Sequence, residues 1–415
     1  MKKSVVIFIT AVCLLITGCG STGSLSKLPS SSFHEDKQKL TIMHIDADNK
    51  RFQDFIAETE KKLDFEKSVE KCPSNADNRQ AKISTILASG DQNIDLISVN
   101  DEMISEFKHK GYLEPLEKNV MTEEVRDSFP QEYLESICEE NGHIYSVPFQ
   151  MDIMMFWVNQ ELLKQAGLDE IKNTGDFDIL QKSLKNSDQY AYGDAWENTH
   201  VYNSLSQFVN FWGGDYFDWT DPKTKDAARY MKSMLDEKNT SPAQFVDQYE
   251  QMEEKFIRGK YGCVFMYTSA LGTFLVADVY GKNKIHMAPL PVLHKKKATN
   301  IATWQYVLNN ASENKDAAVR FLQYAAGYEG STEYAKIMKS YPARVDVIEN
   351  EDIDLEGIDM IRKYLREYTL NARPLCENSM GAVSDMGKLF QGYVLGQCEE
   401  DSFFEQAQNC INTYY

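Results

Sequence analysis

Acidic side chains stand at the ends of two predicted strands, where they could accept hydrogen bonds from a polar ligand. Asp46 comes near the end of the apolar run over residues 39–47, and Asp101 follows the apolar run over residues 94–99 by two positions. Carboxylate oxygens are good acceptors for hydroxyl groups. Either aspartate could instead be the N-cap of the helix that follows it. Both interpretations stay open for each residue.

Aromatic residues gather between positions 196 and 219, and one arginine stands in a Pro-Ala-Arg sequence. The aromatic residues are Trp196, Tyr202, Trp212 and Trp219. Such rings can pack on the C–H faces of sugars, but most buried aromatics belong to a core. We therefore expect at least one of the four to line a ligand site. Arg344 could contact a carboxylate or paired hydroxyls through two nitrogens, and a structural salt bridge is the alternative.

Motifs for catalysis or metal binding are absent from the sequence. It contains no G-x-S-x-G, H-E-x-x-H or phosphate-loop pattern, and its 7 histidines are scattered. No cysteine pair has the C-x-x-C spacing that is typical of zinc sites. With 63 acidic residues, chance carboxylate pairs say nothing about glycoside hydrolysis. We expect no enzyme, no cofactor and no metal.

Strands and helices must position these residues, and residues 39–111 alternate between the two. Residues 39–47 and 65–70 are predicted strands, with an amphipathic helix between them. A helix over residues 81–88, ended by Gly90, leads to a strand at 94–99 and a helix that ends near Gly111. This order predicts right-handed βαβ units around a parallel sheet.

The remaining sequence predicts further strands and many helices. Residues 143–148 form a strand that Pro148 stops, and residues 153–158 form a second strand before a helix at 160–166. Residues 176–260 are mainly helical, and residues 263–267 and 285–290 are predicted strands. An amphipathic helix covers residues 314–326, with Ala317, Ala318, Phe321 and Leu322 facing inward. Helices and loops fill the rest.

The N-terminus has the features of an export signal. Lys2 and Lys3 precede an apolar run from Val5 to Ile16, which is too short to span a bilayer, and small residues precede Cys19. We expect residues 1–18 to be a signal peptide and Cys19 to carry the lipid, although an ordinary secretory signal is the alternative. Residues 19–38 are a Ser-rich tether. The lipid would hold the protein at the outer face of the cell membrane.

Composition limits the remaining classes. Roughly 375 residues follow the tether, which is too many for one ordinary core, so two domains are expected. The net charge of −19 disfavours nucleic acid as a partner, and we expect a monomer. Six cysteines remain after the signal and Cys19, and they could be disulfides or free thiols. They are Cys72, Cys138, Cys263, Cys376, Cys398 and Cys410.

Five stretches in one order resemble the carbohydrate-type extracellular solute-binding proteins of ABC importers, the family that includes maltose-binding protein. The first ends in Gly-Tyr-Leu-Glu-Pro-Leu at 111–116, and the second has Tyr145 and Pro148 before a strand, Asn159 and Ala-Gly-Leu at 166–168. His-Met-Ala-Pro-Leu-Pro at 286–291 is a further match. The stretches cover residues 90–116, 141–168, 256–266, 286–291 and 302–344.

This resemblance implies an α/β fold with two lobes, each a mostly parallel sheet flanked by helices, joined by a hinge. The N-terminal lobe would comprise residues 39–148 and 288–326, and the C-terminal lobe residues 149–287 and 327–415. Ligands of open parallel sheets bind beyond the carboxyl ends of the strands, and a cleft between two lobes can close on a polar ligand.

The resemblance also suggests residues in the cleft. Asp152 lies four positions after Pro148, where the family places an acidic ligand contact, and Gln150 lies between them. Trp304 precedes a strand at a place where the family often has an aromatic residue. The stacking tryptophan expected after Met266 is missing, unless Tyr267 substitutes for it. This departure leaves the ligand class open.

The resulting hypothesis is a solute-binding lipoprotein that captures a mono- or oligosaccharide between its lobes and delivers it to an ABC permease. The ligand would bridge Asp46 and Asp101 on one lobe to Asp152 and aromatic rings on the other. The alternatives are a binding lobe of a surface sensor, a binder of a non-sugar solute and, less favoured, a glycoside-active enzyme.

Overall fold

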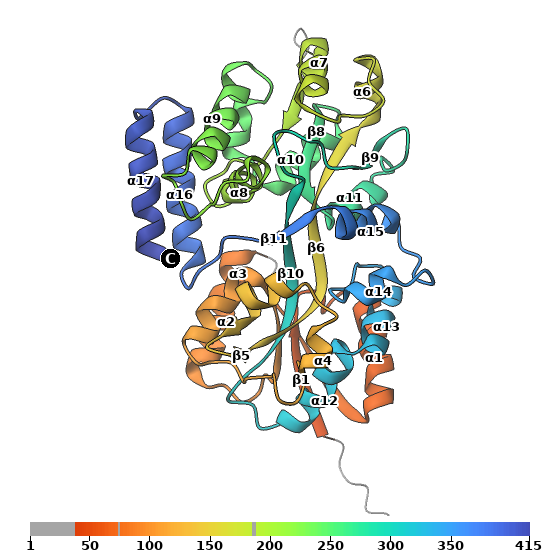
Figure 1. Cartoon of the computed structure of the whole chain (residues 1–415). Coiled ribbons are helices and arrows are strands. Elements are labelled where there is room, and N and C mark those ends of the chain that lie inside the picture. Colours follow the sequence, from red (N-terminus) through yellow and green to blue (C-terminus); the bar gives the residue numbers. More distant parts are fainter. Residues whose placement is uncertain (1–37, 74, 185–187) are drawn as a thin grey trace, which may run out of the picture. The chain divides into compact units, whose positions relative to one another are not determined.

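Figure 1 shows the computed structural model of the chain, which describes residues 38–73, 75–184 and 188–415. The predicted signal peptide (residues 1–18), Cys19 and the tether up to residue 37 lie outside the described residues. The described residues belong to one compact unit. Among them, no helix has the length and apolar character that a membrane span requires.

Residues 38–109 alternate strands with helices, as predicted. The elements are β1 (Gln38–His44), α1 (Lys50–Leu63), β2 (Phe65–Lys71), α2 (Ala76–Ser89), β3 (Leu96–Asn100) and α3 (Asp101–His109). β1 pairs in parallel with both β2 and β3. The carboxyl ends of these strands therefore lie at one edge of the sheet, which is where Asp46 and Asp101 follow them.

Local sequence sets the ends of these helices. The side chain of Asn49 caps α1 by accepting a hydrogen bond from the backbone N–H of Arg51 at 3.0 Å. α2 ends at Gly90, as predicted, with a φ of 65° in the left-handed region that favours glycine. Asn49 is thus the N-cap of α1, and Asn100 occupies the N-cap position of α3. Neither Asp46 nor Asp101 has the capping role that was their alternative interpretation.

Two long strands, β6 (Ser146–Asn159) and β10 (Ala298–Leu308), run through both halves of Figure 1. They pair with each other in antiparallel fashion. β10 pairs with β3 through residues 304–308, whereas β6 pairs with β8 (Tyr261–Tyr267) through residues 154–158. The strand order β2-β1-β3-β10-β6-β8-β7 is therefore continuous. A third segment, β11 (Thr369–Ala372), runs parallel to β10.

The prediction that Pro148 ends a strand is wrong. β6 continues through Pro148 for its full 14 residues, so it joins the end of the first predicted strand to the second. His143 and Ile144 form a separate short strand. Pro148 faces Gln305, and the register with β10 shifts by one residue directly after this pair. Such a bulge accommodates a proline, because the ladder is already interrupted there and the missing N–H costs no hydrogen bond.

The second lobe is built on β7 (Tyr190–Gly193), β8 and β9 (Ile285–Ala288). β7 pairs with β8 in parallel, whereas β8 and β9 both run antiparallel to β6. The predicted two-lobed α/β fold is present, but its sheets are mixed rather than mostly parallel. The reason is that β6 and β10 each belong to the connection between lobes and enter the sheets against their neighbours.

Helices surround both lobes (Figure 1). Short elements connect β3 to β6, and helices connect β6, β7, β8 and β9. The short elements are α4 (Glu123–Arg126), α5 (Gln131–Tyr133), η1 (Leu134–Cys138), β4 (Glu139–Glu140) and β5 (His143–Ile144). The helices are α6 (Gln160–Gln165), α7 (Thr174–Leu184), α8 (Val201–Trp212), α9 (Pro222–Asp236), η2 (Pro242–Val246), α10 (Tyr249–Ile257) and α11 (Ala270–Val276).

The C-terminal helices divide between the lobes. They are α12 (Lys315–Ala326), α13 (Tyr328–Met338), α14 (Val345–Glu349), α15 (Ile358–Glu367), α16 (Ser379–Val394) and α17 (Glu400–Tyr414). α12 buries the four predicted residues of its inner face. α13 packs against α1 and α12, while α16 contacts α8, α9 and also α3. The lobe boundary that the sequence predicts at residue 326 stays a prediction. α13 follows this boundary, yet its contacts with α1 and α12 are with the N-terminal lobe.

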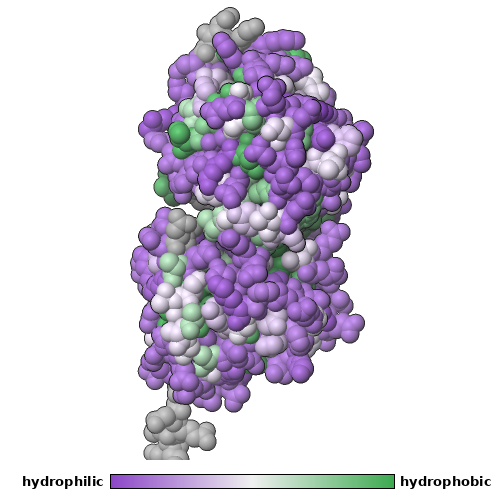
Figure 2. Space-filling model, turned by 90° about the vertical axis from the view of Figure 1, so that its left-hand side faces the viewer, coloured by the Kyte–Doolittle hydropathy of each residue, from purple (hydrophilic) through white to green (hydrophobic). Residues whose placement is uncertain are grey.

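Surface and thiols complete the description. On the face seen in Figure 2, hydrophilic residues dominate and apolar residues form small separate groups. The six cysteines whose state the sequence left open are free thiols in this structure: Cys72, Cys138, Cys263 and Cys410 are buried, and Cys376 and Cys398 are half-buried.

Candidate functional site

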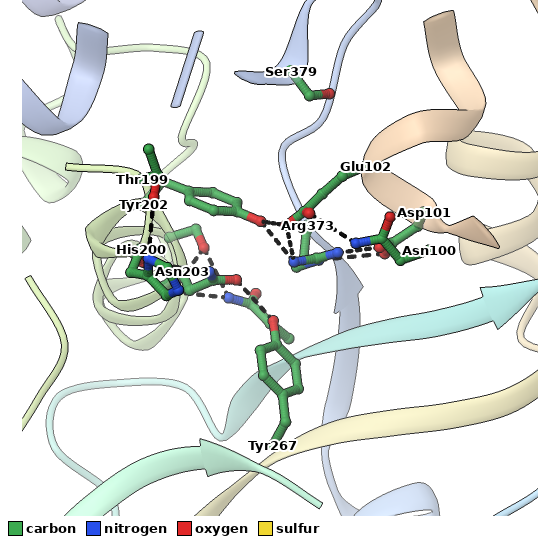
Figure 3. Close-up of polar contacts among 12 residues, drawn as sticks. Asn100, Asp101, Glu102, Thr199, His200, Tyr202, Asn203, Tyr267, Arg373 and Ser379 are labelled. Atoms are coloured by element: carbon green, nitrogen blue, oxygen red, sulfur yellow. Dashed lines mark hydrogen bonds and ion pairs between the residues drawn. The ribbon is translucent and has the colours of Figure 1, made fainter. Parts of the chain in front are cut away.

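A buried ion-pair cluster joins the two lobes. Asp101 and Glu102, the first two residues of α3, face Arg373, which directly follows β11 (Figure 3). The Arg373 guanidinium donates to both Asp101 oxygens, with Nε to Oδ2 at 3.3 Å, and its Nη1 donates to Glu102 Oε1 at 2.6 Å. Asp101 is fully buried, and Arg373 is 7 % exposed. Sequence reasoning found Asp101 but missed the other two residues.

Tyr202 of α8 completes the cluster from the C-terminal lobe. Its hydroxyl donates to Glu102 Oε1 at 2.6 Å and accepts from Arg373 Nη1 at 2.6 Å. The ring of Tyr267, from β8, lies 5.9 Å from the guanidinium carbon, and its hydroxyl donates to Asn203 Oδ1 at 2.9 Å (Figure 3). The structure thus brings together three predicted site residues, Asp101, Tyr202 and Tyr267.

The charge states within the cluster follow from its contacts. Burial disfavours the cation of Arg373, but the facing carboxylates outweigh this effect and raise its pKa further above its ordinary value. Burial also opposes ionisation of Glu102, yet Arg373, Tyr202 and Asn100 together lower the pKa of its carboxyl. Arg373 and Glu102 are therefore a charged pair at neutral pH, and the cluster is a charge-assisted network.

Asp152, on β6, holds the loop after β8. Its Oδ1 accepts hydrogen bonds from Thr268 Oγ1 at 2.5 Å and from the backbone N–H of Ser269 at 2.8 Å. Burial raises the pKa of the Asp152 carboxyl above its ordinary value, against the effect of these hydrogen bonds. The side chain is 9 % exposed, so its direct contacts are with the loop.

A cavity of about 510 Å³ lies beside this loop and has walls from both lobes. We call it the Asp46 cavity. Its polar walls include Asp46, Gln150, Thr268 and Ser269, and its apolar walls include Leu271, Leu275, Met338 and Leu355. Burial raises the pKa of the Asp46 carboxyl. The cavity therefore combines hydrogen-bonding groups with aliphatic surface, which is the composition of small-molecule sites.

A second interlobe cavity, of about 430 Å³, lies next to Arg373. Ser136 and Ile137 border it from the N-terminal lobe, and residues 213–217 border it from the C-terminal lobe. Arg373 lines this cavity and is absent from the walls of the Asp46 cavity. The ion-pair cluster is thus separate from the Asp46 cavity.

Three predicted site residues lie away from both groups. Trp196 is fully buried and donates from Nε1 to Asp194 Oδ2 at 2.8 Å. Trp212 stacks on His294, with 4.9 Å between ring centres. Arg344 donates to Ala326 O at 2.7 Å and to the Asp346 carboxylate at 2.6 and 2.9 Å. Arg344 thus forms the salt bridge that was its alternative interpretation.

Trp304 and Gln150 lie opposite each other on the two long strands that connect the lobes. They are paired positions of β10 and β6. Gln150 lines the Asp46 cavity and accepts a hydrogen bond from the Tyr334 hydroxyl at 3.2 Å. The half-buried ring of Trp304 lies 5.2 Å from the guanidinium carbon of Arg79. Of the two, only Gln150 borders this cavity.

Among the described residues, no group of three or more histidine, cysteine or carboxylate side chains could hold a metal ion. The carboxylates of Asp101 and Glu102 are paired with Arg373. Two cavities lie between lobes that crossing strands join, which is the architecture of a two-lobed binding protein.

Residues 48–332 match the model of the bacterial extracellular solute-binding protein family. Because this match covers more than half of the chain, the protein belongs to that family. Its members bind solutes and are not enzymes. The resemblance inferred from the five sequence stretches is therefore confirmed.

Two curated relatives are similar to the chain over more than half of its length. A probable amino-acid ABC transporter periplasmic-binding protein, y4oP of Sinorhizobium fredii, is 24 % identical over 239 residues, covering 55 % of this chain and 54 % of the relative. A putative binding protein of Brucella abortus is 22 % identical over 259 residues, covering 59 % of this chain and 60 % of the relative. The chain thus spans little more than half the length of these curated relatives.

The solved structures share the fold at low sequence identity. A Thermotoga lettingae ABC transporter solute-binding protein bound with α-D-tagatose has a TM-score of 0.76 and 18 % identity, covering 91 % of this chain and 99 % of that one. Maltose-bound MalE3 of T. maritima has a TM-score of 0.74 and 16 % identity, covering 90 % and 99 %. The sugar-binding protein MalE of Xanthomonas citri has a TM-score of 0.75 and 16 % identity, covering 91 % and 97 %.

Proposed function

We propose that the protein captures a mono- or oligosaccharide in the Asp46 cavity and delivers it to the permease of an ABC importer. The observation that carries this proposal is a cavity of about 510 Å³ with walls from both lobes, next to the strands that join them. Small-molecule sites in proteins typically measure roughly 300–1,000 Å³. A ligand in this position contacts both lobes and favours their closure.

The lining of the cavity supports a sugar. Asp46 and Gln150 supply acceptors for hydroxyl groups, and Ser269 supplies a hydroxyl that both donates and accepts. Leu271 and Leu275 supply aliphatic surface for C–H faces. Two solved structures with the same fold carry α-D-tagatose and maltose. In this arrangement Asp152 positions Ser269, and Asp101 stabilises the interlobe contact rather than contacting the sugar.

A second candidate is an amino acid, because the y4oP relative is named as a probable amino-acid ABC transporter binding protein. Arg51 and Asp46 both line the cavity and offer opposite charges to a carboxylate and an ammonium group. Calorimetric titration with a panel of mono- and oligosaccharides and the common amino acids separates the two candidates. Binding of a sugar and of no amino acid supports the first; the reverse result supports the second.

A variant and its control test whether the ligand binds in the Asp46 cavity. Replacing Asp46→Asn removes one charged acceptor, so the affinity for the panel's best ligand should fall by roughly 10-fold or more. Asp178→Asn, an exposed acid on α7, is the matched control and should bind like the unmodified protein. Equal affinity of both variants would refute the assignment of the ligand to this cavity.

The transport role and the anchor need cellular tests. Deletion of the gene should abolish uptake of the ligand if the protein serves an importer, whereas a sensor would leave uptake intact and abolish a transcriptional response. We also propose that Cys19 carries the lipid, since small residues precede it and a Ser-rich segment follows. Cys19→Ala should then release the protein from the membrane fraction; retention in that fraction would contradict lipidation.

A further inference from the structure

Arg373 stands where three segments of the chain meet. It follows β11, the third segment between the lobes, and it precedes α16, which contacts α3 of the N-terminal lobe and α8 of the C-terminal lobe. All three guanidinium nitrogens donate hydrogen bonds, to Asp101, Glu102 and the hydroxyl of Tyr202. One side chain thus joins residues of both lobes.

The cluster is satisfied by the protein's own groups. The second oxygen of Glu102 accepts from Asn100 Nδ2 at 2.8 Å, and Asp101 Oδ2 also accepts from the Tyr133 hydroxyl at 3.0 Å. Tyr202 adds a direct hydrogen bond between lobes, from its hydroxyl to Glu102. Buried charges are costly unless they are paired and hydrogen-bonded, and here each charge has several partners. The charges and hydrogen-bonding groups of this contact between the lobes are therefore satisfied without any ligand atom.

We propose that Arg373, Asp101, Glu102 and Tyr202 form an interlobe latch that populates the closed form of the protein by itself. Closing the lobes removes these charges from water, and this cost offsets much of their mutual attraction. The latch therefore holds the lobes reversibly, so that solute can still enter. Arg373 is a positioning residue, because it sets how often the two walls of the Asp46 cavity come together.

The latch has a consequence for affinity, and this part rests on the proposed function. When only the closed form binds tightly, the apparent dissociation constant equals the intrinsic constant divided by the closed fraction. The latch residues do not line the Asp46 cavity. Loss of the latch should therefore weaken the binding of every ligand by the same factor. A residue that contacts ligand changes the affinities of different ligands by different factors.

Two variants and one matched control test the latch. Arg373→Gln leaves two buried carboxylates without their cation, and Tyr202→Phe removes only the hydroxyl that bridges to Glu102. Tyr192→Phe is the control, since its buried hydroxyl donates to a carboxylate, Asp194 Oδ2, at 2.7 Å within one lobe. Small-angle X-ray scattering of the protein without added solute should give a larger radius of gyration for Arg373→Gln and Tyr202→Phe, and an unchanged radius for Tyr192→Phe.

An unchanged radius for both latch variants, with native circular dichroism, would overturn the proposal. If Arg373→Gln does not fold, Tyr202→Phe decides the question. In calorimetry, Arg373→Gln should weaken each ligand by one common factor of roughly 5-fold or more, and Tyr202→Phe by a common factor of about 2- to 10-fold. Factors that differ between ligands would assign these residues to the ligand contact instead. If no solute binds, the proposed function fails while the scattering result still tests the latch.

Discussion

Asp152 differs from the other acids of the interlobe region, because its hydrogen bonds go to a loop that lines the Asp46 cavity. Thr268 and Ser269 both donate to its Oδ1, and both residues border the cavity. The carboxylate therefore acts on a ligand through the position of this loop. An amide at residue 152 keeps the size of the side chain but accepts these bonds less strongly.

We predict that Asp152→Asn weakens the affinity of the best ligand by roughly 10-fold. Calorimetry measures the change, and Asp178→Asn is again the exposed control. The stability of the variant should fall little, because burial raises the pKa of Asp152 and makes its charge costly in the fold. An affinity within 2-fold of the unmodified protein would contradict the role of the loop.

Trp196 belongs to the core of the C-terminal lobe in this structure. It packs on Phe245 and Phe390, and its N–H is one of several donors to the buried carboxylate of Asp194. We predict that Trp196→Phe lowers the free energy of unfolding by about 1–3 kcal/mol, since a buried acceptor loses a donor. Ligand affinity should stay unchanged. Urea denaturation and calorimetry test both statements, and a stable variant with weakened binding would contradict them.

Sequence reasoning found part of the site. Asp46 and Asp101 could be predicted because the carboxyl ends of parallel strands meet at one edge of a sheet. Arg373 could not, because it lies 272 residues from Asp101 and within a region whose sequence shows only helices and loops. Glu102 was adjacent to a predicted residue, but only the orientation of α3 reveals that both carboxylates face one guanidinium.

At the scale of elements, the periodicity predicted β1, β2, β3, β8 and β9 but missed β7, β10 and β11. It also did not show how strands cross between the lobes. Residues 143–158 read as two strands around Pro148, whereas β6 is continuous. A proline in a strand is tolerated at a bulge, and the bulge at Phe149 of β6 is a property of the pairing with β10. The sequence of β6 alone does not show how β10 pairs with it.

The end of β1 contains a buried histidine that makes the fold sensitive to acid. His44 is fully buried, stacks on Phe52 at 3.8 Å and accepts a hydrogen bond at Nδ1 from the backbone N–H of Asp46 at 3.0 Å. Burial lowers the pKa of His44 from 6.5 to about 3. The unfolded chain therefore takes up a proton as the pH falls below 6.5, whereas the folded protein does so only near pH 3.

We predict that protonation of His44 in the unfolded chain lowers the free energy of unfolding by about 2 kcal/mol when the pH falls from 7 to 5. Stability falls as pH falls, because the proton binds more tightly to the unfolded state. The difference in unfolding free energy between the two pH values should shrink by about that amount in His44→Phe, whatever the baseline stability of the variant. His109→Gln, an exposed histidine, is the control. An equal pH dependence in His44→Phe and the unmodified protein would contradict the assignment.

At the scale of the whole molecule, no disulfide links the described residues, so noncovalent contacts hold the elements together. Burial raises the pKa of Cys138 to about 12 and that of Cys72 to about 11. Since the thiolate is the reactive form, these thiols should resist alkylation in the native state.

We predict that the six cysteines from Cys72 to Cys410 all alkylate after unfolding without reductant. In the native protein, Cys398 and Cys376 should react first, because they are half-buried while the others are buried. Peptide mapping by mass spectrometry measures each site separately. A disulfide-linked peptide pair in the unreduced protein would contradict this prediction.

The account as a whole claims that the solute binds between two lobes that the crossing strands β6, β10 and β11 connect. The most direct measurement is a crystal structure with the tightest ligand from the calorimetric panel. We predict ligand density in the Asp46 cavity, within hydrogen-bond distance of Asp46, Gln150 or Ser269, with contacts from both lobes. Density confined to one lobe, or to the cavity beside Arg373, would contradict the account.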